Sequence, residues 1–240
     1  MTYVIFFLSA FFQAFGGFGG GLFAVPLLAM SYEPRFIVPP FSLTIVLLNF
    51  IILFEVRRNI DWKKVSRVVV GSILGLPIGT FALASLNQDI IRLLISVVTV
   101  ILGILFLTGF KPEIKEARTT FVIAGIISGF LSGTAAMGGP PLIFLMMALG
   151  LKKDVFRATL VGCFTFNGII SNSLYLANGL FNPLNLKIIL FGFLPALAGV
   201  VLGIAVKNIL PEEKFNRITV VTVVLIGVLG TVRAVSLLLS

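Results

Sequence analysis

Two clusters of glycine and proline in apolar surroundings carry the chemistry that this sequence can offer. They occupy residues 16–26 (GGFGGGLFAVP) and 133–141 (GTAAMGGPP). A helix that begins at a glycine-rich break has backbone N–H groups without intrahelical partners and the positive end of its dipole at the same place. Such a helix N-terminus binds anions without any charged side chain. The clusters therefore predict non-covalent binding of an anion, and Pro140 suits the first turn of the second helix.

Few polar side chains stand in the apolar segments near these clusters. They are Gln13, Ser42, Thr44, Asn49, Ser132, Thr134, Thr159, Thr165 and Asn167. Asn49 and Asn167 can donate amide hydrogens to an oxyanion, or they can hydrogen-bond between helices. We include Asn49, Thr134 and Asn167 in the candidate substrate site. Arg157 begins an apolar segment, where it either guides anions at a cytoplasmic mouth or anchors the segment at the interface.

The remaining reactive residue types argue against other chemistry. All nine acidic residues lie at or outside the ends of the apolar segments, and the chain has no histidine. A cation site and a carboxylate proton relay within the membrane are therefore disfavoured. The lone Cys163 lies in an apolar run and is expected to be a core residue. We expect no metal, no cofactor and no enzymatic activity.

The composition specifies the kind of element that must position these groups. The chain has 240 residues, 58% of them hydrophobic and 11% charged, with a mean hydropathy of +1.15. This predicts an all-α polytopic membrane protein. The net charge is +9, and the basic residues lie between the apolar spans. They therefore indicate membrane topology rather than nucleic-acid binding. We expect neither a cleaved secretory signal nor an appended soluble domain.

The sequence repeats itself at a shift of 118 residues. This shift aligns Gly20-Gly21 with Gly138-Gly139, Asn49 with Asn167, and Leu76-Pro77 with Leu194-Pro195. We interpret residues 1–110 as a first membrane repeat, 111–118 as a cytoplasmic linker and 119–240 as a second repeat. Each repeat holds four apolar segments. Those of the first repeat are at about 2–30, 36–54, 65–86 and 90–110, and those of the second are at about 119–150, 155–177, 184–209 and 215–239.

The distribution of basic residues favours re-entrant segments. If all eight segments cross the membrane, the 18 lysines and arginines divide 10 to 8 between the two sides. If segments 2–30 and 119–150 enter and leave on one side, the division becomes 14 to 4, as the positive-inside rule prefers. This predicts two inverted repeats, each with three spanning helices and a broken, re-entrant Gly-rich hairpin. The two breaks should face each other, and both termini should lie outside.

The motifs resemble those of the sulfite exporter TauE/SafE family. They are GGFGGGLFAVP at 16–26, SGTAAMGGPPL at 132–142, Arg-Ala-Thr at 157–159, and Leu-Pro at 76–77 and 194–195. The resemblance implies export, or sometimes import, of sulfur-containing anions such as sulfite and organosulfonates across the bacterial cytoplasmic membrane. It implies that the path is lined by Gly20, Gly21, Gly138, Gly139 and Pro141. Pro39-Pro40 replaces the Arg157-Ala158 of the second repeat, so the halves should contribute unequally.

We therefore predict a secondary transporter, an exporter, for a small sulfur-containing or organic oxyanion. The anion would bind at the membrane midplane, held by the helix N-termini of the two broken helices. The predicted partners are this small-molecule anion and the lipid bilayer, without nucleic acid. An anion channel and a non-transporting membrane component remain the alternatives. The sequence does not reveal the substrate, the coupling ion or the oligomeric state.

Overall fold

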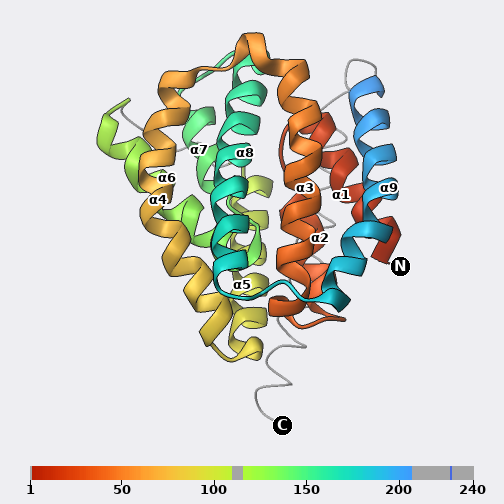
Figure 1. The fold of residues 1–240 in the computed structure, drawn as a ribbon. Coiled ribbons are helices and arrows are strands. Elements are labelled where there is room, and N and C mark those ends of the chain that lie inside the picture. Colours follow the sequence, from red (N-terminus) through yellow and green to blue (C-terminus); the bar gives the residue numbers. More distant parts are fainter. Residues whose placement is uncertain (1, 110–115, 207–227, 229–240) are drawn as a thin grey trace.

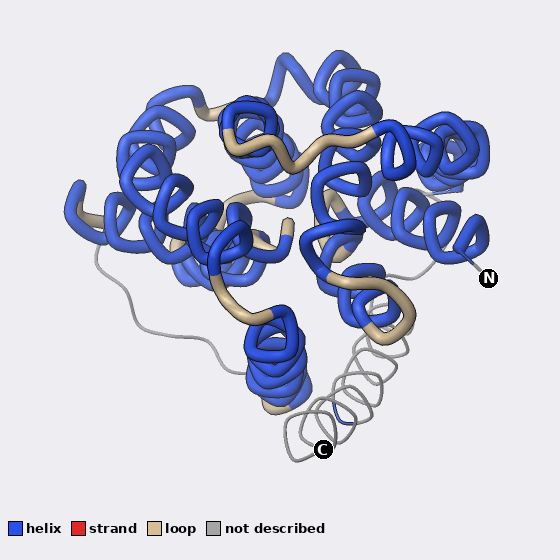
Figure 2. Tube along the Cα trace, turned by 60° about the horizontal axis from the view of Figure 1, so that its bottom comes forward, coloured by secondary structure: helices blue, strands red, loops and turns tan. Residues whose placement is uncertain are grey.

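A computed structural model describes residues 2–109, 116–206 and 228, and these residues form helices joined by short loops (Figure 2). The helices are α1 (Thr2–Gly16), α2 (Gly20–Ala29), α3 (Pro34–Val56), α4 (Trp62–Ser85), α5 (Gln88–Leu107), α6 (Arg118–Ala135), α7 (Gly139–Ala148), α8 (Lys153–Ala177) and α9 (Pro183–Val206), with a short 3-10 helix, η1 (Arg57–Asn59), after α3. The predicted all-α class is confirmed for the described residues.

Five of these helices are long and apolar enough to cross a membrane: α3 with η1, α4, α5, α8 and α9. They correspond to the predicted spans 36–54, 65–86, 90–110, 155–177 and 184–209. The predicted span 215–239, apart from residue 228, and most of the linker 111–118 lie outside the described residues. Large apolar side chains stay exposed on the outer faces, for example Phe81 on α4 and Leu194 on α9, as lipid contact requires.

The two long segments that we predicted to be broken are indeed broken. Segment 2–30 forms α1 and α2, and segment 119–150 forms α6 and α7. The start of α1 and the residues after α2 lie at the same end of the bundle, because the hydroxyls of Thr2 and Tyr32 are 3.1 Å apart. That geometry is a helical hairpin. Its re-entry into a membrane on one side stays a prediction.

The helix–helix contacts occur in pairs, and the two members of each pair are related by swapping the two halves of the chain. At the 118-residue shift, α1, α2, α3 and α4 correspond to α6, α7, α8 and α9. The most extensive contacts join α4 to α6 and α1 to α9, and α3 packs on α8 at the centre (Figure 1). The lesser pairs α4–α8 and α3–α9 are likewise related by the exchange. Two repeats would pack in this way, and the two-repeat organisation stays a prediction.

The contact between α4 and α6 depends on glycine. Its glycines recur every four residues on both helices: Gly71, Gly75 and Gly79 on α4, and Gly125, Gly129 and Gly133 on α6. A Cβ added to Gly75 would lie 2.0 Å from the carbonyl oxygen of Ile126. The backbones therefore approach too closely for side chains, as in other small-residue helix contacts. The spacing is visible in the sequence, although we did not predict this contact from it.

The polar contacts separate the two ends of the bundle. At one end the Asp61 N–H donates to Thr159 Oγ1 over 3.2 Å, and Lys64 Nζ pairs with Glu116 at 2.9 Å. At the other end the Arg35 N–H donates to Gln88 Oε1 over 2.8 Å. The five basic residues Arg57, Arg58, Lys63, Lys64 and Arg67 thus share an end with the start of α8, which we call the basic end (Figure 1). Cytoplasmic placement of that end remains a prediction.

A labelling experiment tests this placement. Cysteines introduced at Arg58 and Asp154, both exposed at the basic end, should react with a membrane-impermeant maleimide only from the cytoplasmic side. A cysteine at the exposed Asn178, beyond the end of α8, should react only from outside. The native Cys163 is buried and should give no background. Labelling of Arg58→Cys and Asp154→Cys from opposite sides would contradict the re-entrant topology.

Candidate functional site

A cavity of about 70 Å³ lies between the two halves. Both breaks and the two central helices line it, and none of the described residues in its wall is charged. The wall includes Gln13 and Gly21 from the first break, Gly138 and Gly139 from the second, Asn49 from α3, and Asn167 from α8. The cavity therefore offers dipoles and hydrogen bonds to a ligand rather than a counter-ion.

The first break depends on glycines in the left-handed backbone region. Gly17 and Gly19 have φ angles of +78° and +95°, which ordinary residues rarely adopt. Gly19 then forms the N-cap of α2, whose first intrahelical bond runs from the Phe23 N–H to the Gly19 carbonyl over 3.0 Å. The chain reverses here, and the N-terminus of α2 lies at the cavity.

The second break ends α6 by a different device. Ala136 has a φ of 52°, its N–H donates to the Ser132 carbonyl, and the Met137 N–H donates to the Leu131 carbonyl. The bond from the Ala136 N–H to the Ser132 carbonyl is that of an αL helix cap. Together the two bonds satisfy carbonyls at the end of α6 that would otherwise lack partners in an apolar segment. An alanine in this conformation costs about 1 kcal/mol relative to glycine. The two breaks thus reach similar shapes with different residues.

The two breaks face each other, as predicted. A Cβ on Gly21 would lie 2.1 Å from the carbonyl oxygen of Ala136, and one on Gly138 would lie 1.9 Å from Ser132 Oγ. Close packing alone is therefore enough to require glycine at positions 21 and 138. At Gly139 the nearest atom, in Phe164, would be 3.5 Å away, so packing does not account for that glycine.

The two helix N-termini supply different numbers of N–H donors. The first turn of α2 carries N–H groups on Gly20, Gly21 and Leu22, and that of Gly20 donates to Gln13 Oε1 over 3.4 Å. The first turn of α7 carries one, on Gly139, because the next two residues are prolines. The N–H donors available at the two helix N-termini are therefore mainly those of Gly21 and Leu22 of α2, an asymmetry that the paired Gly motifs do not reveal.

Each central asparagine is hydrogen-bonded to the first helix of its own half. Gln13 Nε2 donates to Asn49 Oδ1 over 3.4 Å. Asn167 Nδ2 donates to Ser128 Oγ over 3.3 Å, and Ser128 Oγ donates to the Gly138 carbonyl over 2.7 Å. Gln13 was among the polar groups expected near the breaks, whereas Ser128 was not predicted. The repeat gave no signal for either residue, since their equivalents are Leu131 and Ala10.

Five of the eight predicted substrate-site residues line the cavity: Gly21, Asn49, Gly138, Gly139 and Asn167. The other three are not part of its wall. The Gly20 N–H is bonded to Gln13, and Thr134 Oγ1 donates to the Phe130 carbonyl over 2.7 Å within α6. Pro141 occupies the first turn of α7, while its neighbour Pro140 is in the wall. Substrate contact by any of these residues stays a prediction.

Arg157 is buried outside the cavity wall and joins the two halves. Its guanidinium forms a 2.7 Å ion pair with Glu55 at the end of α3 and a 2.7 Å hydrogen bond to the Ala14 carbonyl near the end of α1. Its stem covers Gly17, where an added Cβ would lie 2.7 Å from Arg157 Cγ. Arg157 thereby caps α1 at the first break. Its predicted role at a cytoplasmic mouth is untested.

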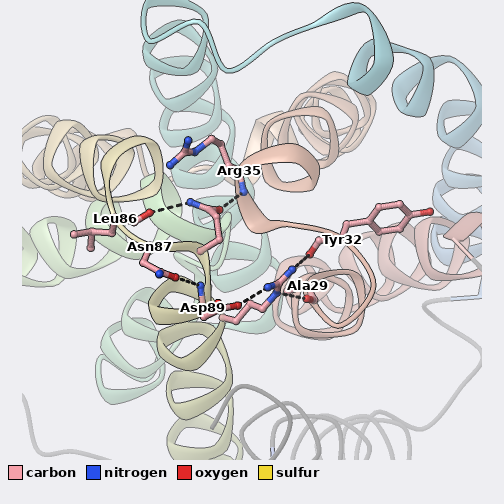
Figure 3. A network of polar contacts seen from close by, with 8 residues as sticks. Ala29, Tyr32, Arg35, Leu86, Asn87 and Asp89 are labelled. Atoms are coloured by element: carbon pink, nitrogen blue, oxygen red, sulfur yellow. Dashed lines mark hydrogen bonds and ion pairs between the residues drawn. The ribbon is translucent and has the colours of Figure 1, made fainter. Parts of the chain in front are cut away.

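A second arginine holds the other end of α2. Arg92 on α5 donates to the carbonyls of Ala29 and Tyr32, over 3.1 and 3.4 Å, and pairs with Asp89 (Figure 3). A cation is favourable at the C-terminus of a helix, where carbonyls lack intrahelical partners. Arg92 therefore fixes the helix whose opposite end lies at the cavity. Nothing in the spacing of the chain signals this contact.

The fold and the cavity together define a class. Interrupted helices that meet at a shared central cavity in a multi-pass membrane protein are an arrangement found in secondary transporters.

The chain belongs to the sulfite exporter TauE/SafE family, whose sequence model matches residues 2–229. It is 26% identical over 172 residues to a protein of Cupriavidus necator described as "Probable sulfite/organosulfonate exporter TauE". That match covers 68% of this chain and 66% of the relative. No solved structure matches the chain. The protein is thus a multi-pass membrane protein of a transporter family.

Proposed function

We propose that this protein carries a small sulfur-containing oxyanion, sulfite or an organosulfonate, out of the bacterial cell across the cytoplasmic membrane. The observation that carries the proposal is the cavity shared by the two breaks. It is walled by residues from both halves, including the repeat-related Asn49 and Asn167, and no described wall residue is charged. The family and its Cupriavidus necator member support sulfur oxyanions as the substrate class.

The electrostatics of the cavity suit one negative charge. Each helix N-terminus acts as about half a positive charge, so the ends of α2 and α7 together offer about one. Moving one negative charge outward is favoured by about 2.3 kcal/mol for every 100 mV of inside-negative potential. An exporter of this kind needs no coupling ion to drive efflux.

The proposed topology places both termini outside and the basic end of the bundle in the cytoplasm. The α1–α2 and α6–α7 hairpins then enter from opposite faces, and the breaks meet near the midplane. Arg157 stands at the cytoplasmic end of the first break, within reach of an anion that approaches from that side. The exchange-related packing of the helices supports two inverted repeats.

Flux measurements in proteoliposomes test the function. Sulfite or methanesulfonate should move with saturable kinetics, and external substrate should accelerate efflux. Asn49→Ala should raise the half-saturating concentration about tenfold, since a hydrogen bond to a charged group contributes about 1.5–3 kcal/mol. The control is Asn178→Ala, because Asn178 is exposed beyond α8 and lies away from the cavity. Absence of flux for every sulfur oxyanion would contradict the proposal, and currents at channel rates would favour a pore.

A further inference from the structure

Asn49 and Asn167 occupy equivalent positions in the two repeats, yet they present opposite hydrogen-bonding groups. Both are 1% exposed, and both line the cavity. Their orientation follows from the backbone groups to which each is linked. Those groups differ between the breaks: an N–H donor in the first and a carbonyl acceptor in the second.

In the first half the linkage begins at a donor. The Gly20 N–H can only donate, so Gln13 must present Oε1 to it. The amide of Gln13 therefore turns Nε2 toward Asn49, and Asn49 must present Oδ1. Asn49 Nδ2 is left as the remaining donor. This side of the cavity thus offers N–H groups, which suit the oxygen of an anion.

In the second half the linkage begins at an acceptor. Ser128 gives its single hydroxyl hydrogen to the Gly138 carbonyl, so its oxygen can only accept from Asn167. Asn167 must therefore present Nδ2 to Ser128, which leaves Oδ1. Asn167 Oδ1 is buried and has no hydrogen-bond partner. A buried acceptor without a partner is unfavourable, and a ligand that brings a donor relieves this cost.

We propose that the cavity selects a singly charged oxyanion that still carries a proton, namely hydrogensulfite rather than dianionic sulfite. The inference rests on the proposed function and names the protonation state of its substrate. The charged oxygens of hydrogensulfite accept from Asn49 Nδ2 and from the N–H groups of Gly21 and Leu22. Its remaining proton is donated to Asn167 Oδ1.

Charge and size agree with this choice. The desolvation cost of an ion rises with the square of its charge, and about one unit of positive helix dipole does not compensate a dianion. A single buried water needs about 10–15 Å³ of accessible cavity volume. The cavity of about 70 Å³ therefore admits roughly five water-sized groups, enough for an ion the size of hydrogensulfite.

The pH dependence of binding tests the proposal in the wild-type protein. The apparent dissociation constant for total sulfite, measured by calorimetry on purified protein, should rise about tenfold per pH unit above the second ionisation of sulfurous acid. Methanesulfonate, a permanent monoanion without a donor, should bind independently of pH over the same range. Sulfite affinity that increases with pH would overturn the proposal while leaving the proposed function in place. If neither anion binds at any pH, the proposed function itself fails.

Variants of the two asparagines separate their roles. Asn167→Leu should weaken hydrogensulfite about tenfold more than methanesulfonate, because only hydrogensulfite donates to Oδ1. Asn49→Leu should weaken both anions by similar factors. Equal losses for the two anions in Asn167→Leu would overturn the proposal. The wild-type pH profile decides the question if a variant does not fold.

Discussion

Gly75→Ala should unfold this protein at a markedly lower temperature than the wild type, with a loss of about 3 kcal/mol or more in stability. The added Cβ would lie 2.0 Å from the Ile126 carbonyl oxygen and 2.8 Å from the Phe130 amide nitrogen. Both are backbone atoms, so no side-chain rotation relieves the overlap. Helix propensity alone would make the alanine variant more stable by about 1 kcal/mol. A loss of stability would therefore report the steric overlap with α6.

Gly16→Ala is the matched control for this prediction. Gly16 is also helical, but an added Cβ would meet only Phe18 Cε1 at 3.6 Å, an ordinary contact. Unfolding followed by thermal denaturation in detergent micelles should show little change for this variant. If Gly75→Ala is as stable as Gly16→Ala, then α4 and α6 approach less closely than the structure shows. The α4–α6 contact joins the two halves, so its loss should also abolish flux.

Glu55 and Arg157 should show a coupling of about 1–2 kcal/mol in a double-mutant cycle of thermal stability. Glu55→Gln removes the charge that faces a guanidinium whose side chain is only 9% exposed. Arg157→Met removes that guanidinium and also uncaps the Ala14 carbonyl at the end of α1. Each single variant is therefore destabilised, and the double variant loses less than the sum. The partial exposure of Glu55, 28%, keeps the coupling below that of a fully buried pair.

The Lys64–Glu116 pair is the control for this cycle. The Glu116 side chain is 52% exposed, so Glu116→Gln should cost no more than about 1 kcal/mol. Additive effects of Glu55→Gln and Arg157→Met would contradict a structural ion pair. A higher rate of anion flux in Glu55→Gln, with unchanged stability, would instead support a role of Arg157 in guiding anions.

The positions of the breaks followed from residue types. Gly17 and Gly19 adopt the left-handed backbone that glycine permits, and the prolines at 140 and 141 begin a helix, as proline does. The asparagine pair was also identified from the repeat. The glycine spacing on α4 and α6 was equally readable, yet in an apolar chain with 24 glycines it did not stand out. Thr134 was placed in the site by proximity in sequence, but its hydroxyl bonds within α6.

The sequence by itself determined that the chain is a helical membrane protein with two interrupted helices, because hydrocarbon tolerates few backbone arrangements and glycine marks where they end. The tertiary structure decided what the breaks offer a ligand. Gln13 reaches Asn49 across 36 positions of the sequence, and Ser128 reaches Asn167 across 39. Those contacts turn two equivalent asparagines in opposite senses. Hydrogen-bond polarity depends on which groups meet in space, and the spacing of residues along the chain does not encode it.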